Sequence, residues 1–412
     1  MAAIALVDTD AHITESPDLW TSRVSSKWGD LVPHLELVDP PKTFAESRNL
    51  VFGEHLPKMQ AWYSGDVRLA MAGASAYAGW HEPFPLHPPT IEEAHPASND
   101  LASRLAVMDE QGIYAQALYP NVGGFGSARF RQMKEQELAL ECVRAYNDFL
   151  VDWTEPAAGR FIRTAAIPYW DIEATVSEAE RVAGLGFKAL IFSGAPQEHG
   201  LPFLAEPHWV PLWEVAERHG LAISFHLGSG NFHGRHFNYE RVRNETPEDS
   251  FARLTTMGFL EGALHVTDLL HSGVLSRHPG LKFIAAESGI GWVPFVLEAA
   301  DYHFLEGTGG RRTDDLLPSE RFRRQVYVSF WFEQIAPARL IDCIGRANVI
   351  FETDFPHPSC LWPSEAVGAA RENLSQLPDE LQRRVLQTNA AELFGIDPTE
   401  VHAWESAAGL RA

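Results

Sequence analysis

Short apolar runs alternate with longer amphipathic stretches along most of the chain. The runs are rich in β-branched and aromatic residues, and most are followed by polar or glycine-containing turns. Such runs predict buried strands, and the periodic stretches between them predict helices. The eight predicted strands contain residues 4–7, 115–120, 161–168, 187–194, 221–228, 281–289, 326–332 and 348–356.

This alternation predicts a (β/α)8 barrel of the TIM type. Near-continuous apolar strands separated by helices are typical of a parallel sheet that is buried on both faces. A doubly wound open sheet is the alternative, and it would require a phosphate-binding loop after an early strand. The glycine-rich stretch 122–129 lacks the third glycine of the dinucleotide fingerprint. We therefore interpret Gly123, Gly124 and Gly126 as part of a mobile active-site loop.

A long segment, residues 33–96, separates the first two predicted strands and is rich in Pro, Gly and aromatic residues. We interpret it as an irregular insertion that forms a lid, because loops of this length inside a compact domain are usually functional. The last part of the chain, residues 362–412, is expected to consist of helices. The whole chain, residues 1–412, is therefore predicted to be a single barrel domain.

Composition narrows the classes of partner. The chain of 412 residues has 33 basic and 55 acidic side chains and a formal net charge of −22. This charge argues against nucleic acid or an anionic membrane as a partner. Cys142, Cys343 and Cys360 lie far apart without a CxxC motif, as is typical of a reducing compartment. The sequence shows no signal peptide and no long apolar span, so we expect a soluble cytoplasmic protein.

Metal-ligating residue types follow several of the predicted strands. Asp10 and His12 follow the first strand, His226 ends the fifth, Glu287 ends the sixth and Asp354 ends the eighth. In a barrel enzyme these strand ends meet at one face, where the active site lies. Asp10 and His12 are two residues apart, so both side chains point to the same side of their strand. The sequence therefore predicts that these residues form one site.

The four residues Asp10, His12, His226 and Asp354 provide two imidazoles and two carboxylates. This mixture suits one divalent transition metal, with zinc as the first expectation and manganese or iron as alternatives. Each residue alone has a simpler explanation, because a strand-end histidine is usually a satisfied polar residue and an aspartate often caps a turn. Four such residues at the same barrel edge favour the metal site.

The same motifs resemble a known family. The D-x-H motif at Asp10, the histidine at 226, the ESGIGWVP motif at Glu287 and the TDFPHP motif at Asp354 together resemble the amidohydrolase superfamily. The resemblance extends from residue 7 to about residue 396. The most similar branch includes aminocarboxymuconate-semialdehyde decarboxylase and the aromatic-acid decarboxylases.

The resemblance implies a distorted barrel that holds a single divalent metal. It assigns ligand roles to His12, His226 and Asp354, and to Asp10 in place of the more common histidine. Many family members have a histidine where this chain has Glu287, so both a ligand role and an acid/base role stay open for Glu287. The catalytic residues expected on this basis are Asp354, Glu287 and His226.

The expected activity is cleavage of a C–C bond, the decarboxylation of a small aromatic or muconate-type carboxylic acid. A hydrolase that uses metal-activated water on a C–N, C–O or C–C bond is the alternative, and a barrel that binds a ligand without turnover is the third interpretation. A homodimer is expected by analogy. The residues expected to contact the substrate are Trp80, His81, Arg104, Tyr119, Arg235, Trp292, Trp331 and His357.

Overall fold

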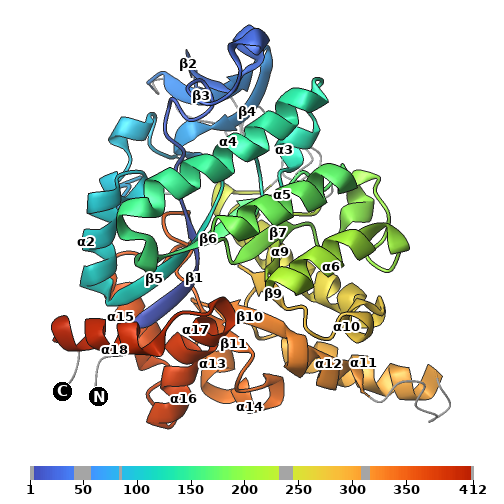
Figure 1. Ribbon diagram of the computed structural model, residues 1–412. Coiled ribbons are helices and arrows are strands. Elements are labelled where there is room, and N and C mark those ends of the chain that lie inside the picture. The colour runs from blue at the N-terminus through green and yellow to red at the C-terminus, as the bar shows by residue number, and fades with distance from the viewer. Residues whose placement is uncertain (1–3, 41–56, 83–85, 232–244, 308–315, 410–412) are drawn as a thin grey trace.

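The computed structural model describes residues 4–40, 57–82, 86–231, 245–307 and 316–409. Its centre is a closed barrel of eight parallel strands in the order β1-β11-β10-β9-β8-β7-β6-β5, surrounded by helices (Figure 1). The barrel prediction is confirmed, and all eight predicted strands are present. Their bounds are β1 Leu6–His12, β5 Ile113–Tyr119, β6 Phe161–Ala166, β7 Ala189–Phe192, β8 Ala222–His226, β9 Phe283–Ala286, β10 Val326–Phe330 and β11 Val349–Phe351.

Closure of the barrel brings the beginning of the chain beside its end. Strand β1 pairs in parallel with β5 on one side, where His12 lies opposite Tyr119, and with β11 on the other, where Asp8 lies opposite Phe351. The register between β1 and β5 shifts between Asp8 and Ala11. This irregularity contains Asp10, one of the residues predicted to bind metal.

Helices connect the strands and cover the outside of the barrel. The longest, α9, packs against α11 and α12, and the helices after β11 close the bottom of the barrel near the N-terminus (Figure 1). No described helix is both long and apolar enough to span a membrane. The helices of at least eight residues are α2 Leu101–Gln111, α4 Gln136–Thr154, α5 Ile172–Gly184, α6 Val210–His219, α9 Pro247–His271, α11 Val293–Gly307, α12 Pro318–Gln325, α15 Ser364–Glu372 and α18 Pro398–Ala407.

Shorter helical segments complete the connections. Those near the cavity described below are η1 Ser26–Leu31, η2 Ala72–Ser75 and α3 Ala128–Arg131. The remaining ones are η3 Ile91–Glu93, η4 Pro96–Ser98, η5 Glu155–Arg160, η6 Pro196–His199, η7 Pro207–Trp209, α10 Val274–Arg277, α13 Ile335–Arg339, α14 Ile341–Ile344, α16 Asp379–Arg383, η8 Arg384–Thr388 and α17 Asn389–Phe394.

The insertion after β1 contains regular structure, in contrast to the irregular segment that we expected. Strands β2 His34–Val38, β3 Met59–Ser64 and β4 Val67–Met71 form an antiparallel sheet in the order β2-β3-β4. Only Gly65 and Asp66 separate β3 from β4, and Gly65 has a φ of 54° that favours glycine in such a tight hairpin. The sheet stands beyond one end of the barrel, at the top of Figure 1.

The C-terminal helices anchor the first strand of the barrel. The Glu405 carboxylate on α18 accepts a hydrogen bond from the backbone N–H of Ala5 at 2.9 Å, and the Gln387 side chain donates to the carbonyl of Ala5 at 3.0 Å. Glu405 is buried and also receives a hydrogen bond from Arg383 at 2.8 Å. These contacts fix the start of β1, and with it the position of the site residues that follow.

Candidate metal and proton-transfer site

Strand β1 supplies two ionisable side chains to the candidate site. Asp8, Asp10 and His12 belong to the strand, and all three are fully buried. Asp10 and His12 are two residues apart at the strand end, where barrel active sites are built, and His12 Nε2 lies 3.3 Å from Asp10 Oδ1. The register shift between Asp8 and Ala11 interrupts the alternation of side chains before them. Asp8 therefore lies apart from the pair, beside Gln116 of β5, which in turn contacts Arg104 of α2.

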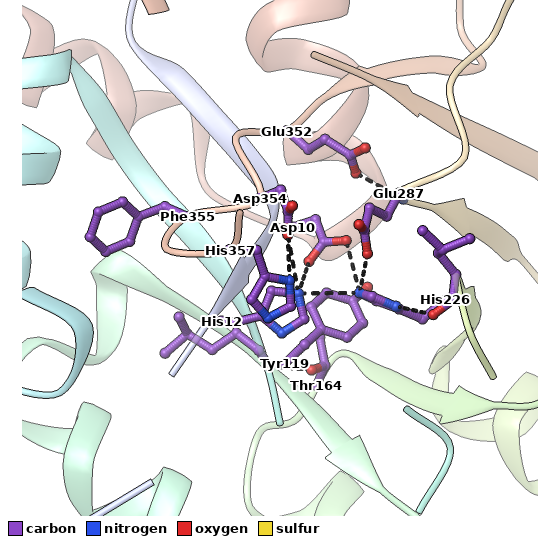
Figure 2. A network of polar contacts seen from close by, with 12 residues as sticks. Asp10, His12, Tyr119, Thr164, His226, Glu287, Glu352, Asp354, Phe355 and His357 are labelled. Carbon is purple, nitrogen blue, oxygen red and sulfur yellow. Dashed lines mark hydrogen bonds and ion pairs between the residues drawn. The ribbon is translucent and has the colours of Figure 1, made fainter. Parts of the chain in front are cut away.

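Asp10 and His12 meet side chains from two other strand ends. His226 Nε2 lies 3.1 Å from Asp10 Oδ2, 3.3 Å from His12 Nε2 and 3.6 Å from Glu287 Oε2. His12 Nε2 is 3.3 Å from Asp10 Oδ1. The four buried residues Asp10, His12, His226 and Glu287 therefore present ligand atoms within 4.8 Å of one another (Figure 2).

A second group shares two members with the first. His12, Glu287, Asp354 and His357 also have ligand atoms within 4.8 Å of one another. Asp354 Oδ1 lies 3.5 Å from His12 Nε2 and 2.9 Å from His357 Nδ1. The predicted ligands Asp10 and Asp354 thus belong to different groups that overlap at His12 and Glu287.

The two carboxylates at the ends of β9 and β11 have an uncommon backbone conformation. Glu287 has a φ of 51° and Asp354 a φ of 57°, which place both residues in the left-handed region. This region is costly for residues other than glycine, and such strain is concentrated at functional sites. Strain at both strand ends turns the two side chains toward His12 and His226 (Figure 2).

Burial and mutual repulsion dominate the electrostatics of the acidic side chains. Burial raises the pKa of Glu287 well above its ordinary value, and the charges of Asp354, Asp10 and Glu352 raise it further. Burial also raises the pKa of Asp354, although His357 opposes this shift. Several carboxylates this close together in a buried site cannot all be ionised unless positive charge is added.

The pKa values of His12 and His226 are shifted in opposite directions. Burial and the charge of His357 lower the pKa of His12 to about 3, so His12 is a neutral imidazole that can donate a lone pair to a metal. Burial lowers the pKa of His226, but the charges of Asp10 and Asp354 and the hydrogen bond to Leu227 raise it overall. The two histidines also outweigh the burial of Asp10 and lower its pKa.

The donor atoms of this cluster fit a divalent cation. Both carboxylate oxygens of Asp10 and the Oδ1 of Asp354 are buried, and no aligned hydrogen bond satisfies them. Buried polar atoms are rarely left in this state, and a cation would satisfy all three. His226 Nδ1 lies 2.8 Å from the carbonyl of Leu227, which holds Nε2 toward the cluster in the manner of a metal-binding histidine.

A further buried network positions the strand ends. Asp8 accepts hydrogen bonds from Thr353 N at 2.9 Å, Thr353 Oγ1 at 2.6 Å and Gln116 Nε2 at 2.9 Å. Burial raises the pKa of Asp8 to about 7. Arg104 donates to the carbonyl of His12 at 2.7 Å and to Ala97 at 2.5 Å. These contacts hold the backbones of β1 and β11 beside the cluster.

A cavity of about 900 Å³ opens above the cluster. Glu287 and His357 line it, and His357 Nε2 lies 2.8 Å from Asn121 Oδ1. Of the described residues that we expected to contact the substrate, only His357 lines this cavity. Arg235 lies outside the described residues.

The other expected contact residues lie elsewhere. Arg104 is fully buried, and its guanidinium contacts backbone carbonyls and the Phe355 ring, 4.7 Å away, so a substrate carboxylate cannot reach it in this structure. Tyr119 is buried below the cluster with its hydroxyl 2.9 Å from Ser224 Oγ. Trp292 and Trp331 donate their indole N–H groups to the carbonyls of Ser288 and Ser359. Trp80 is partly buried and His81 is exposed.

The structure adds residues that sequence reasoning missed. Phe125 lines the cavity, and its ring stacks on His226 with a centroid distance of 4.0 Å and an interplanar angle of 30°. Glu15 also lines the cavity and accepts hydrogen bonds from Asn121 N at 2.7 Å and Val122 N at 2.9 Å. Glu352 is buried and accepts from Glu287 N at 3.2 Å. The spacing of two between Glu352 and Asp354 was the available signal for Glu352.

A parallel barrel that gathers imidazoles and carboxylates at its strand ends belongs to the class of metal-dependent barrel enzymes. Comparison with known families defines it further. The chain belongs to the amidohydrolase family, because the family profile described as Amidohydrolase matches residues 7–396.

Curated relatives of the chain are decarboxylases. It is 26% identical over 320 residues to gamma-resorcylate decarboxylase of Rhizobium radiobacter, which covers 72% of this chain and 87% of the relative. It is 27% identical to gamma-resorcylate decarboxylase of Polaromonas sp., over 71% of this chain and 87% of the relative. A shorter match, 28% identical over 137 residues, is to 6-methylsalicylic acid decarboxylase of Penicillium expansum, over 31% of this chain and 39% of the relative.

Solved structures share the fold. An amidohydrolase of Mycobacterium avium subsp. paratuberculosis superimposes with a TM-score of 0.69 at 20% identity, covering 95% of this chain and 99% of the other. A 5-carboxyvanillate decarboxylase of Sphingomonas paucimobilis gives 0.61 at 22% identity, over 96% and 100%. A dihydroxybenzoic acid decarboxylase of Polaromonas sp. with bound manganese and 2-nitroresorcinol gives 0.56 at 19% identity, over 97% and 99%.

Proposed function

We propose that this protein is a metal-dependent decarboxylase that removes CO2 from a small aromatic carboxylic acid. The observation that carries the proposal is the pair of overlapping buried groups, in which carboxylates and imidazoles share His12 and Glu287. One group can hold a cation, while carboxyl groups of the other group transfer a proton. The curated relatives that resemble the chain over most of their length are decarboxylases, which supports the proposed reaction.

Asp10, His12 and His226, together with Asp354 or Glu287, would hold one divalent cation. When bound, the cation supplies positive charge that polarises and orients the oxygen atoms of the substrate. Zinc was the first expectation from the ligand types, but a related structure contains manganese. Since two of the proposed ligands are hard carboxylates, we expect manganese to support turnover at least as well as zinc.

Decarboxylation requires one proton and no redox partner. The bond between the ring carbon and the carboxylate breaks, its electron pair stays on the carbon, and the carbon takes a proton while CO2 leaves. Glu287 is suited to donate this proton, because it is a buried carboxyl group beside the proposed ligands, and burial and the neighbouring acids raise its pKa. It also lines the cavity, so the substrate can reach it. Solvent then returns a proton to the carboxylate.

Asp354 is the second group that can transfer a proton. Its Oδ1 lies 2.9 Å from His357 Nδ1, and Ser359 Oγ donates to its Oδ2 at 3.3 Å. His357 is in turn held by Asn121 and lines the cavity. His357 therefore connects the cavity to the buried Asp354. An imidazole at the cavity wall can exchange protons with Asp354 in this arrangement.

The test incubates the manganese-loaded protein with hydroxybenzoic acids, including 2,6-dihydroxybenzoate, in deuterium oxide. The proposal predicts release of CO2 and one deuterium on the ring carbon that carried the carboxylate. Incorporation of labelled oxygen from water without CO2 release would instead identify a hydrolase. Binding of these acids without any turnover would favour the ligand-binding barrel. The homodimer and the cytoplasmic location remain predictions, which chromatography with light scattering and cell fractionation test.

A further inference from the structure

The cavity above the cluster continues away from the barrel to the small sheet of the insertion. We propose that this outer part, lined by residues of η1, β4 and the start of α4, binds an apolar extension of the substrate. The inference rests on the proposed function and narrows its substrate class to acids larger than a single ring. The extension would be a second ring or a chain of about six carbons.

The size of the cavity is the first argument. A monocyclic hydroxy acid has about ten non-hydrogen atoms, and one water volume of about 30 Å³ for each atom gives a generous total of about 300 Å³. The cavity measures about 900 Å³. Pockets of roughly 300–1,000 Å³ hold ligands of drug size. A one-ring acid would therefore leave most of this cavity to water.

The two ends of the cavity differ in chemistry. The barrel end carries the ionisable side chains Glu287 and His357, with Phe125 beside them. A carboxylate and its ring belong at this end, close to the proposed cation. The opposite end has no such concentration of buried acids and histidines among its described lining residues.

Aliphatic side chains from several elements line the outer end. Val67, Leu69 and Met71 of β4 line it, together with Leu31 of η1 and Met133 before α4. Charged side chains lie between them along the same wall of the cavity, namely Asp66, Arg68, Lys134 and Glu135. An apolar group of the substrate would cover these aliphatic side chains, and each CH2 group removed from water strengthens binding about fourfold at most.

The location of the sheet supports a role in binding. Strand β4 is the last strand of an antiparallel sheet that stands beyond the barrel (Figure 1). Val67 is 58% exposed and Leu31 is 40% exposed although both line the cavity. These aliphatic side chains contact water along a cavity that leads to the buried ionisable site. They are therefore suited to bind an apolar ligand.

The experiment compares two acids that share the same reactive ring, 2,6-dihydroxybenzoate and its derivative with a hexyl chain para to the carboxylate. Binding constants are measured by calorimetry, and kcat/KM by product formation, with the manganese-loaded protein. We expect the extended acid to bind at least tenfold more tightly than the short acid, since several buried CH2 groups contribute. Equal or weaker binding of the extended acid would overturn the inference.

Two exposed cavity residues provide the variant. The double substitution Leu31→Asp and Val67→Asp places charges in the outer end at two exposed positions, and a thermal melt checks that the fold is retained. We expect it to remove most of the preference for the extended acid while the short acid binds as before. The matched control is Leu37→Asp on β2, which is 62% exposed and does not line the cavity. An unchanged preference in the double variant would contradict the inference.

The readouts separate this inference from the proposed function. Decarboxylation of both acids with equal efficiency and equal binding would retain the proposed function and overturn the extended substrate. Tighter binding of the extended acid without CO2 release from either acid would retain the outer binding region and overturn decarboxylation.

Discussion

The two walls of the cavity differ in almost every physical property. The barrel wall is buried and dense in ionisable groups, with Asp10, His12 and Asp354 fully excluded from solvent. The opposite wall, built on β4, is partly exposed and carries aliphatic side chains, as Val67 illustrates. Burial makes charge interactions strong at the first wall, whereas the second wall can contribute mostly by removing apolar surface from water.

This difference implies a division of labour. Residues of the barrel wall are expected to control metal content and kcat, because they act on the reacting atoms. Residues on the opposite side are expected to control substrate affinity and KM. A substitution in the barrel wall that changed KM alone, or one in the opposite wall that changed kcat alone, would contradict this division.

The largest effect is expected from His226→Ala. The substitution removes a proposed ligand whose Nε2 lies 3.1 Å from Asp10 Oδ2. A cation contributes several kcal/mol to charge stabilisation, and each 1.36 kcal/mol is tenfold in rate, so turnover should fall by about 10³-fold or more. Metal analysis should show the cation lost as well. His219→Ala, at an exposed position on α6, is the control, and metal retained with normal turnover in His226→Ala would contradict the assignment.

A smaller loss of turnover is expected from Glu287→Gln, which keeps the side-chain shape and removes the proton. General acid catalysis typically contributes 10²–10⁴-fold, so kcat should fall by about 10²-fold or more. Retained metal would assign Glu287 to proton transfer, and lost metal would make it a ligand. Glu298→Gln on the exposed side of α11 is the control. Unchanged kcat would remove Glu287 from the mechanism.

A moderate effect on KM is expected from Phe125→Leu. The Phe125 ring stacks on His226 at 4.0 Å and lines the cavity, where the ring of a substrate would pass. Aromatic pairs contribute about 0.5–1.5 kcal/mol, so KM should rise by about 2–10-fold with little change in kcat. The exposed Phe203 offers Phe203→Leu as a control. A fall in kcat with constant KM would show instead that Phe125 acts on the reaction through His226.

The smallest effect is expected from Tyr119→Phe. Tyr119 shares a buried hydrogen bond of 2.9 Å with Ser224 below the cluster and does not line the cavity. Its loss should lower the free energy of unfolding by about 1 kcal/mol in a urea titration, with turnover retained. A double-mutant cycle with Ser224→Ala isolates the contribution of the bond. A large rise in KM would restore the substrate role that the sequence predicted for Tyr119.

The barrel was predictable because each strand is a compact apolar run between clear helical stretches. The sheet of the insertion was not predicted, although its sequence contained a signal. The Gly65-Asp66 pair lies between two short strand-like runs, as is typical of a two-residue hairpin. The surrounding Pro- and Gly-rich sequence concealed this pattern.

The site was predictable only in part. The residue types at the strand ends identified Asp10, His12, His226, Glu287 and Asp354, because barrel strand ends converge. Their division into two overlapping groups depends on side-chain direction and on the left-handed backbone at two of them. Sequence periodicity does not encode these features. Arg104 shows the converse case, since a charged residue that suggested substrate binding is buried against backbone carbonyls.

The most direct test of the central claim is a metal titration of the protein after treatment with a chelator. Calorimetry with Mn²⁺ should show about one tight site per chain, and the site should be lost in both His12→Ala and His226→Ala, whose residues come from β1 and β8. A protein that binds no divalent cation, or that binds it equally well in both variants, would contradict the claim.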